Sequence, residues 1–143
     1  MRSLIWMGVI FAVLGGCTWH TERRVQQQNE RLAEKLEPVR MEYKGNPFTG
    51  STITRVWAGT PGTSTLETAD ATLREDVWAS FRQACGYERE DRKQVRIVRH
   101  DPPLAYEVWV FQDPDSNRVD NTVGLSLILR STPERGGTDI RIK

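Results

Sequence analysis

The 143-residue sequence has few of the residues that usually mark an active site or a metal site. It contains two histidines, His20 and His100, and two cysteines, Cys17 and Cys85. These residues form no HExxH motif and no Cys/His cluster with zinc spacing, and no serine or cysteine lies in a nucleophile context such as G-x-S-x-G. We therefore predict that the protein is not an enzyme and that it has no catalytic residue, no metal site and no cofactor.

One segment begins like a cation-binding motif without completing it. The spacing of Asp113, Asp115 and Asn117 is that of the first ligands of a calcium loop. Such a loop also needs Gly at its sixth position and Glu at its twelfth. Those positions hold Arg118 and Gly124, so we interpret the segment as a hairpin turn.

The sequence also lacks an excess of charge of one sign and a membrane-spanning apolar run. It has 20 Lys and Arg against 19 Asp and Glu, a balance that gives no reason to expect binding to nucleic acid. The apolar run near the start, residues 3–14, has no charged side chain, but a helix needs about 20 apolar residues to cross a bilayer. A basic residue, a short apolar run and small residues at its exit are typical of a secretory signal.

The exit of this run, Leu14-Gly15-Gly16-Cys17, resembles the lipobox of bacterial lipoproteins. The resemblance implies that residues 1–16 are a signal peptide and that Cys17 carries a diacylglyceryl group and further acylation, with palmitate as a typical chain. In that family an Asp after the cysteine favours the inner membrane, whereas this chain has Thr18. We therefore expect a lipoprotein of the outer membrane, anchored by its lipid and facing the periplasm. The alternative is an uncleaved anchor with an incidental cysteine.

Residues 17–45 are interpreted as the lipid anchor and a helical tether. A helix is predicted over residues 21–37, because Thr21 is a suitable N-cap and Pro38 ends the run of helix formers. Its few apolar side chains form one narrow stripe, too thin for a coiled coil: Val25, Leu32, Leu36 and Val39. The tether is either a spacer or partner-docking helix, or a solvated helix packed loosely on its own domain.

Residues 46–143 are predicted to form one periplasmic α+β domain, a small antiparallel sheet packed against one main helix. Strands are expected where β-branched residues or alternation of apolar and polar residues occur, at residues 52–57, 94–100, 106–111, 123–130 and 140–142. The segment from Tyr106 to Phe111 is apolar on both faces, which favours a position in the middle of the sheet.

The main helix of this domain is predicted to begin at the capping box formed by Thr72 and Glu75 and to end at Gly86. Four side chains recur at every fourth position: Leu73, Val77, Phe81 and Cys85. We expect this face to pack on the sheet, which would bury Cys85. The alternative for an unpaired thiol in an oxidising compartment is pairing between chains.

The order of these parts resembles that of the α/β type of pilotin, the small lipoproteins that deliver secretin subunits to the outer membrane. In that family a lipidated cysteine leads to a helical segment, strands, a helix that ends near a cysteine, as in WASFRQACGYE (residues 78–88), and further strands. The family tends to pair that cysteine with a later one, and no cysteine follows Cys85. The resemblance implies a groove beside helix 73–85 that accepts an amphipathic peptide helix. The candidate partner-binding residues are Leu73, Val77, Trp78, Phe81 and Trp57.

The sequence therefore favours a lipid-anchored accessory protein that binds an envelope partner. The expected partner is a secretin or a core-complex subunit of a secretion system or another trans-envelope machine, and the expected process is protein transport. The alternative is an immunity or inhibitor lipoprotein that neutralises a periplasmic toxin or hydrolase, with a protruding loop at Arg55–Thr65.

Overall fold

The structure is a computed structural model that describes residues 19–46 and 48–143. The predicted signal peptide and the predicted lipidation site, Cys17, lie outside the described residues. The described chain divides into two compact units. We call residues 19–35 with Arg40–Val56 the helix–hairpin unit, and Leu36–Val39 with Trp57–Lys143 the sheet unit. Within the described residues, no helix is both long and apolar enough to cross a membrane.

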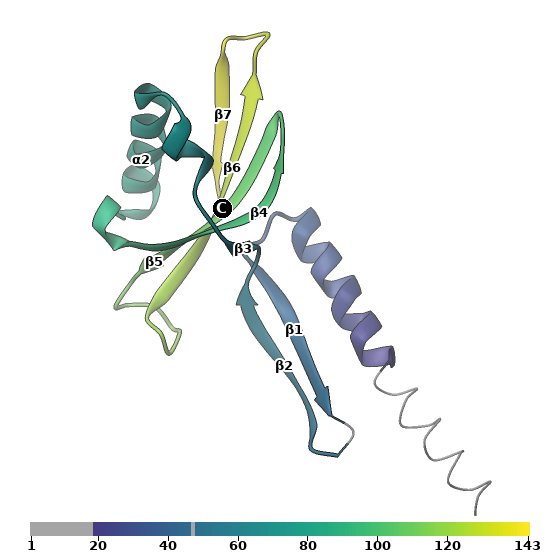
Figure 1. Cartoon of the computed structure of the whole chain (residues 1–143). Helices are drawn as coiled ribbons and strands as arrows, with labels where there is room; N and C mark the ends of the chain where they lie inside the picture. The colour runs from purple at the N-terminus through teal and green to yellow at the C-terminus, as the bar shows by residue number, and fades with distance from the viewer. Residues whose placement is uncertain (1–18, 47) are drawn as a thin grey trace, which may run out of the picture. The chain divides into compact units, whose positions relative to one another are not determined.

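The helix–hairpin unit contains a helix over residues 19–34 and the two-stranded sheet of β1 (Val39–Asn46) and β2 (Gly50–Trp57) (Figure 1). The helix ends earlier than the predicted residue 37, because Leu36 has a left-handed backbone conformation with φ of 56° that cannot continue the helix. Strand β2 confirms the strand expected at residues 52–57, and β1 occupies a segment that we had assigned to the tether. The predicted boundary between residues 45 and 46 thus falls inside the hairpin.

One side chain holds the helix to the hairpin. The Asn29 amide nitrogen donates to the Met41 carbonyl at 2.9 Å, and the Met41 N–H donates to the Asn29 side-chain oxygen at 2.7 Å. The amide therefore bonds to β1 as a neighbouring strand would, with one donor and one acceptor. This pair fixes the helix alongside β1 at the level of Met41.

The sheet unit is a five-stranded antiparallel sheet in the order β3-β4-β5-β6-β7, packed against one main helix (Figure 1). The strands are β3 (Thr60–Pro61), β4 (Arg92–Asp101), β5 (Leu104–Gln112), β6 (Thr122–Thr132) and β7 (Gly137–Ile142). Strand β5 is central, and all its residues from Ala105 to Phe111 are buried, as its two apolar faces predict. The α+β prediction is confirmed.

Helix α2 (Ala71–Cys85) follows the short 3₁₀ helix η1 (Thr65–Thr68) and precedes a second one, η2 (Arg89–Asp91). Its N-cap is Asp70, whose carboxylate accepts from the Leu73 N–H at 2.9 Å. The prediction of a start at Thr72 is therefore wrong by two residues. Gly86 ends the helix as predicted, with φ of 77° and its N–H donating to carbonyls of the last turn, a conformation that glycine adopts without strain.

The expected burial of Cys85 is wrong: its side chain is exposed. Four residues turn an α-helix by about 400°, so positions spaced by four drift about 40° at each step. Between Leu73 and Cys85 this drift carries the last position well away from the sheet. The buried positions of α2 are instead Val77, Trp78 and Phe81.

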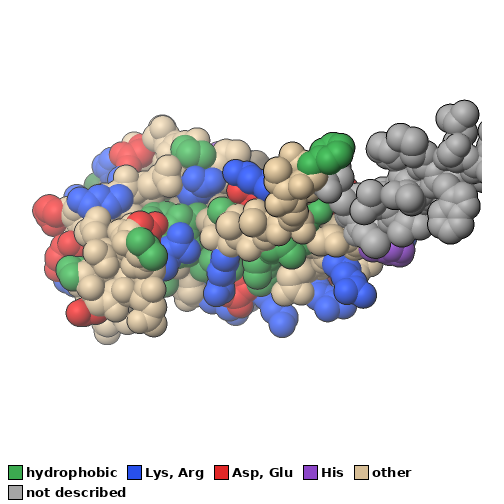
Figure 2. Space-filling view, turned by 90° about the horizontal axis from the view of Figure 1, so that it is seen from below, with side chains coloured by type: hydrophobic (Ala, Val, Ile, Leu, Met, Phe, Trp, Pro, Cys, Tyr) green, Lys and Arg blue, Asp and Glu red, His purple; other side chains and the backbone are tan. Residues whose placement is uncertain are grey.

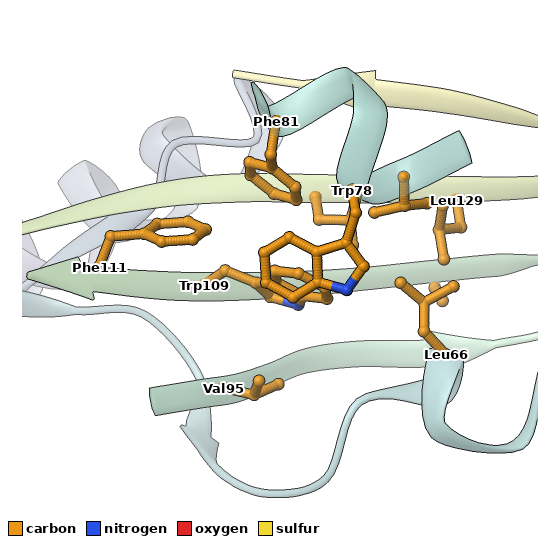
Figure 3. Close-up of a cluster of buried hydrophobic side chains, with 10 residues drawn as sticks. Leu66, Trp78, Phe81, Val95, Trp109, Phe111 and Leu129 are labelled. Carbon is orange, nitrogen blue, oxygen red and sulfur yellow. The ribbon is translucent and has the colours of Figure 1, made fainter. Parts of the chain in front are cut away.

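The core between α2 and the sheet is built largely from aromatic rings (Figure 3). Phe81 stacks on Trp109 with ring centres 4.9 Å apart, and Trp78 lies 5.0 Å from Trp109 at a tilted angle. Tyr87, just beyond the helix, stacks on Phe111 at 4.6 Å. Such pairs contribute about 0.5–1.5 kcal/mol each beyond the area that they bury, so this cluster fixes α2 on the sheet.

The opposite face of the sheet carries a second buried cluster, which includes Tyr106, Val108 and Ile128. Two chain segments of the same unit pack there. The Tyr106 hydroxyl donates to the Glu37 carbonyl at 2.5 Å, and the Trp57 ring lies against Gly124, where a Cβ atom would come within 2.6 Å of the ring. Both faces of the central strands are therefore covered by the sheet unit itself.

Candidate functional site

A buried carboxylate on the central strand β5 binds the start of the short helix η1. Glu107, on β5, is only 1% exposed and accepts four hydrogen bonds. The Ser64 hydroxyl (2.7 Å) and the Trp109 indole N–H (2.8 Å) donate to Oε2, and the Thr65 N–H (2.7 Å) and hydroxyl (2.8 Å) donate to Oε1. Because a buried charge is tolerated only when its lone pairs are satisfied, we interpret Glu107 as the residue that fixes η1 on β5.

The segment that Glu107 holds forms one wall of an apolar depression of about 210 Å³, which we call the apolar hollow. Its other walls come from the start of α2, the turn between β4 and β5, and strands β6 and β7. The lining side chains include Leu66, Ala69, Leu73, Pro103, Leu104 and Leu129, with the hydroxyls of Ser131 and Thr138 among them. The hollow is smaller than the roughly 300–1,000 Å³ of typical small-molecule sites, a size suited to an apolar side chain.

A second depression, of about 410 Å³, runs beside α2 and is charged. We call it the arginine groove. The Arg92 guanidinium lies 4.5 Å from the centre of the Trp109 ring and 5.3 Å from that of Trp78, and it pairs with Glu67 at 3.2 Å. Arg89 pairs with Glu75 on the helix side. Arg89 and Arg92 are thus paired with carboxylates and lie against aromatic rings, and Arg74 is a third cation that lines the groove.

The structure does not bring the five predicted partner-binding residues together on one surface. Leu73 lines the apolar hollow, and Trp78 lines the arginine groove. Val77 and Phe81 have no exposed area and belong to the core. Trp57 packs on Gly124, with the Arg118 guanidinium 4.2 Å above its ring.

The segment considered for an inhibitory loop does not protrude from the sheet unit between residues 57 and 65. Thr60 and Pro61 form β3 and pair with Ile97 and Arg96 of β4. The Arg96 guanidinium also donates to the Ala58 carbonyl at 3.0 Å and to the Gly59 carbonyl at 2.6 Å. These bonds hold the segment along β4, so its geometry does not favour insertion into another protein.

The calcium-like segment adopts the predicted turn between β5 and β6. The Asp113 carboxylate accepts from the Tyr87 hydroxyl at 2.6 Å and from the Asp115 N–H at 2.9 Å. The Tyr87 hydrogen bond, followed by that from Asp115, lowers the pKa of Asp113 below its ordinary value. Across residues 19–46 and 48–143, no group of three or more His, Cys, Asp or Glu side chains is placed to hold a metal ion.

Sequence reasoning missed two features of this region, Glu107 and the apolar hollow. The single acidic residue in the apolar run of β5 was a signal for the first, because an acidic side chain in a buried strand requires partners. Three of its four hydrogen bonds come from Ser64 and Thr65, which lie 43 and 42 residues earlier in the chain, and no local pattern connects them to Glu107. The hollow likewise combines residues of η1, the start of α2 and the four strands β4 to β7, so no single motif marks it.

The sheet unit is thus a small α+β domain with two depressions in its surface, one apolar and one charged. Comparison of the chain with protein-family models, with curated proteins and with solved structures finds no match.

Proposed function

We propose that the protein is a lipid-anchored accessory protein of the outer membrane, on its periplasmic face, that binds a protein of a secretion system or another trans-envelope machine. The membrane part of this proposal rests on the Leu14–Cys17 motif and on Thr18. The binding part rests on the sheet unit, where an open apolar surface adjoins a charged one. A role like that of the pilotins, which the chain resembles in layout, combines both parts.

The apolar hollow is the observation that carries the binding role. Amphipathic peptides dock by placing apolar side chains at helical spacing into a groove, and burial of one such side chain contributes about 1.5–3 kcal/mol. The hollow offers apolar contacts from Leu66, Leu73 and Leu104. Leu66 also lines the arginine groove, so a peptide could place an apolar residue in the hollow and polar residues along α2. We therefore propose a secretin or core-complex subunit as the partner, bound through such a peptide.

The experiment fills the hollow while leaving the core unchanged. Ser131 is exposed at the rim of the hollow, and its backbone N–H, which donates to the Pro103 carbonyl, is kept in any substitution. Ser131→Trp should occupy the hollow with an indole. Arg130→Trp is the matched control, because Arg130 is also exposed and adjacent residues of a strand point to opposite faces.

The measurement is co-purification of the lipidated full-length protein from envelopes in mild detergent, with partners quantified by mass spectrometry. We expect a secretin or core-complex subunit with the wild type and with Arg130→Trp, and its loss with Ser131→Trp. Equal recovery with both variants would refute the role of the hollow. Recovery of a single hydrolase or toxin would refute the assembly role and support the inhibitor alternative.

A further inference from the structure

The start of the described helix and the tip of the β1–β2 hairpin lie at the same end of the helix–hairpin unit (Figure 1). Glu22, in the first described turn of the helix, lines one shallow depression together with residues 43–46 and 49–52, which surround the tip. Asn29, further along the helix, bonds to Met41 on β1. The helix and β1 therefore run side by side, and the chain enters the unit where the hairpin turns.

This end exposes two aromatic side chains. Phe48, in the turn between β1 and β2, is 88% exposed, and Trp19, at the start of the described helix, is 56% exposed. The Arg23 guanidinium lies 5.5 Å from the centre of the Trp19 ring. Large apolar side chains exposed beside cations are typical of a surface that meets a membrane interface.

The helix–hairpin unit also has an excess of positive charge that the balanced whole-chain composition conceals. Its described residues contain seven Lys and Arg against four Glu, whereas the sheet unit contains twelve Lys and Arg against fifteen Asp and Glu. Arg23, Arg24 and Lys44 belong to the end with the hairpin tip. Figure 2, which is seen from below the view of Figure 1, shows Lys and Arg side chains and hydrophobic side chains exposed at the surface. Basic residues of this kind are attracted to anionic phospholipids.

We propose that this end, which we call the tip face and define by Trp19, Arg23, Lys44 and Phe48, is a membrane-contact site. Phe48 and Trp19 enter the headgroup layer of a phospholipid bilayer, and Arg23 and Lys44 bind lipid phosphates. This inference rests on the proposed lipid at Cys17. Cys17 precedes Trp19 by two residues, a stretch of at most about 7 Å, so an anchored lipid brings the tip face to the bilayer surface. The protein then contacts the membrane at two places, its lipid and its hairpin.

The test measures the depth of the hairpin in the membrane, because a lipid anchor alone would keep any variant bound. An environment-sensitive maleimide dye is attached to Thr49→Cys, next to Phe48, in a Cys85→Ser background that removes the exposed native thiol. Ile53→Cys is the control site, since Ile53 is exposed on β2 and about 13 Å further along the strand from residue 49. The full-length lipidated protein is inserted into phosphatidylethanolamine–phosphatidylglycerol vesicles that contain spin-labelled lipids as quenchers.

We expect a blue shift and several-fold stronger quenching of the dye at residue 49 than at residue 53, and loss of most of that quenching when Phe48→Ser is added. Equal quenching at the two sites in protein that floats with the vesicles, or quenching unaffected by Phe48→Ser, would overturn the membrane contact and leave the lipid anchor standing. Protein that does not float with the vesicles and has an unmodified Cys17 would overturn the anchor and, with it, this inference.

Discussion

The Glu107→Gln substitution tests how strongly the buried carboxylate holds η1 on the sheet. Each carboxylate oxygen accepts from one hydroxyl and one N–H: Oε2 from Ser64 and the Trp109 indole, and Oε1 from Thr65 through its side chain and its backbone. A glutamine NH₂ group must replace one of these oxygens. The hydroxyl on that side can rotate and accept from the amide, but the N–H cannot, so either orientation leaves one N–H without an acceptor.

The magnitude follows from the hydrogen bonds lost. A buried unsatisfied donor costs about 1–3 kcal/mol, and bonds to a charged acceptor are worth about 1.5–3 kcal/mol against about 1 kcal/mol for neutral ones. We therefore expect Glu107→Gln to lower the free energy of unfolding by about 2–4 kcal/mol. With a urea m-value of about 2 kcal/mol per M, the unfolding midpoint should fall by about 1–2 M.

The assay is urea unfolding followed by tryptophan fluorescence, since Trp109 is both a core residue and a partner of Glu107. Glu134→Gln makes the same chemical change at an exposed position and should alter stability by less than about 0.5 kcal/mol. A Glu107→Gln protein as stable as the Glu134→Gln control would show that the carboxylate does not hold η1, and the reasoning would fail.

Three further predictions concern α2 and the residues that follow it. Phe81→Ala should lower stability by about 3–5 kcal/mol, because the ring is fully buried against Trp109 and its removal leaves a cavity; a melting temperature that hardly moves would contradict this packing. Tyr87→Phe should raise the pKa of Asp113 toward its ordinary value, because it removes the hydrogen bond that lowers it most. Because the pKa is lowered in the folded protein, the hydrogen bond stabilises the fold above the ordinary carboxyl pKa, and this contribution disappears as the pH falls through the lowered value. An NMR titration that gives Asp113 the same pKa in both proteins would refute the role of the Tyr87 hydrogen bond. Cys85 should react fully with a maleimide in the native protein, because its side chain is exposed. Near neutral pH it should react more slowly than a free thiol, because partial burial raises its pKa. Protection of the thiol until urea is added would show that it is buried.

The parts of the fold that could be predicted from sequence are those set by local patterns. The two-sided apolar run of β5 predicts a central strand, and Gly86 predicts the end of α2; both are confirmed. The start of α2 was missed because two oxygen-bearing residues, Asp70 and Thr72, precede the same apolar run. The capping-box pattern favoured Thr72, whereas the backbone geometry puts Asp70 in reach of the Leu73 N–H.

Strand β1 was missed because its first residue fits both a strand pattern and a helix pattern. Val39, Met41 and Tyr43 alternate with Arg40, Glu42 and Lys44, which is a strand pattern. Val39 also extends the helical stripe of Leu32 and Leu36, so the segment was assigned to the tether and no strand was predicted there. The left-handed conformation of Leu36 separates the helix from the strand, and no local sequence motif predicts it.

The candidate site was the least predictable part. An apolar stripe shows which face of a helix is buried, but the same pattern fits a face buried in the protein's own core and a face that binds a partner. Val77 and Phe81 satisfy that pattern by lying in the core, while Leu73 and Trp78 reach two different depressions. The binding surface proposed for the sheet unit depends on contacts between segments far apart in the chain, which only the fold reveals.

Intact-mass spectrometry of the protein purified from cells is the most direct test of the proposed lipid anchor. The account predicts a chain that begins at Cys17, without residues 1–16, and carries the added mass of a diacylglyceryl group and an acyl chain. A chain with its first 16 residues still attached, or with an unmodified Cys17 thiol, would contradict it.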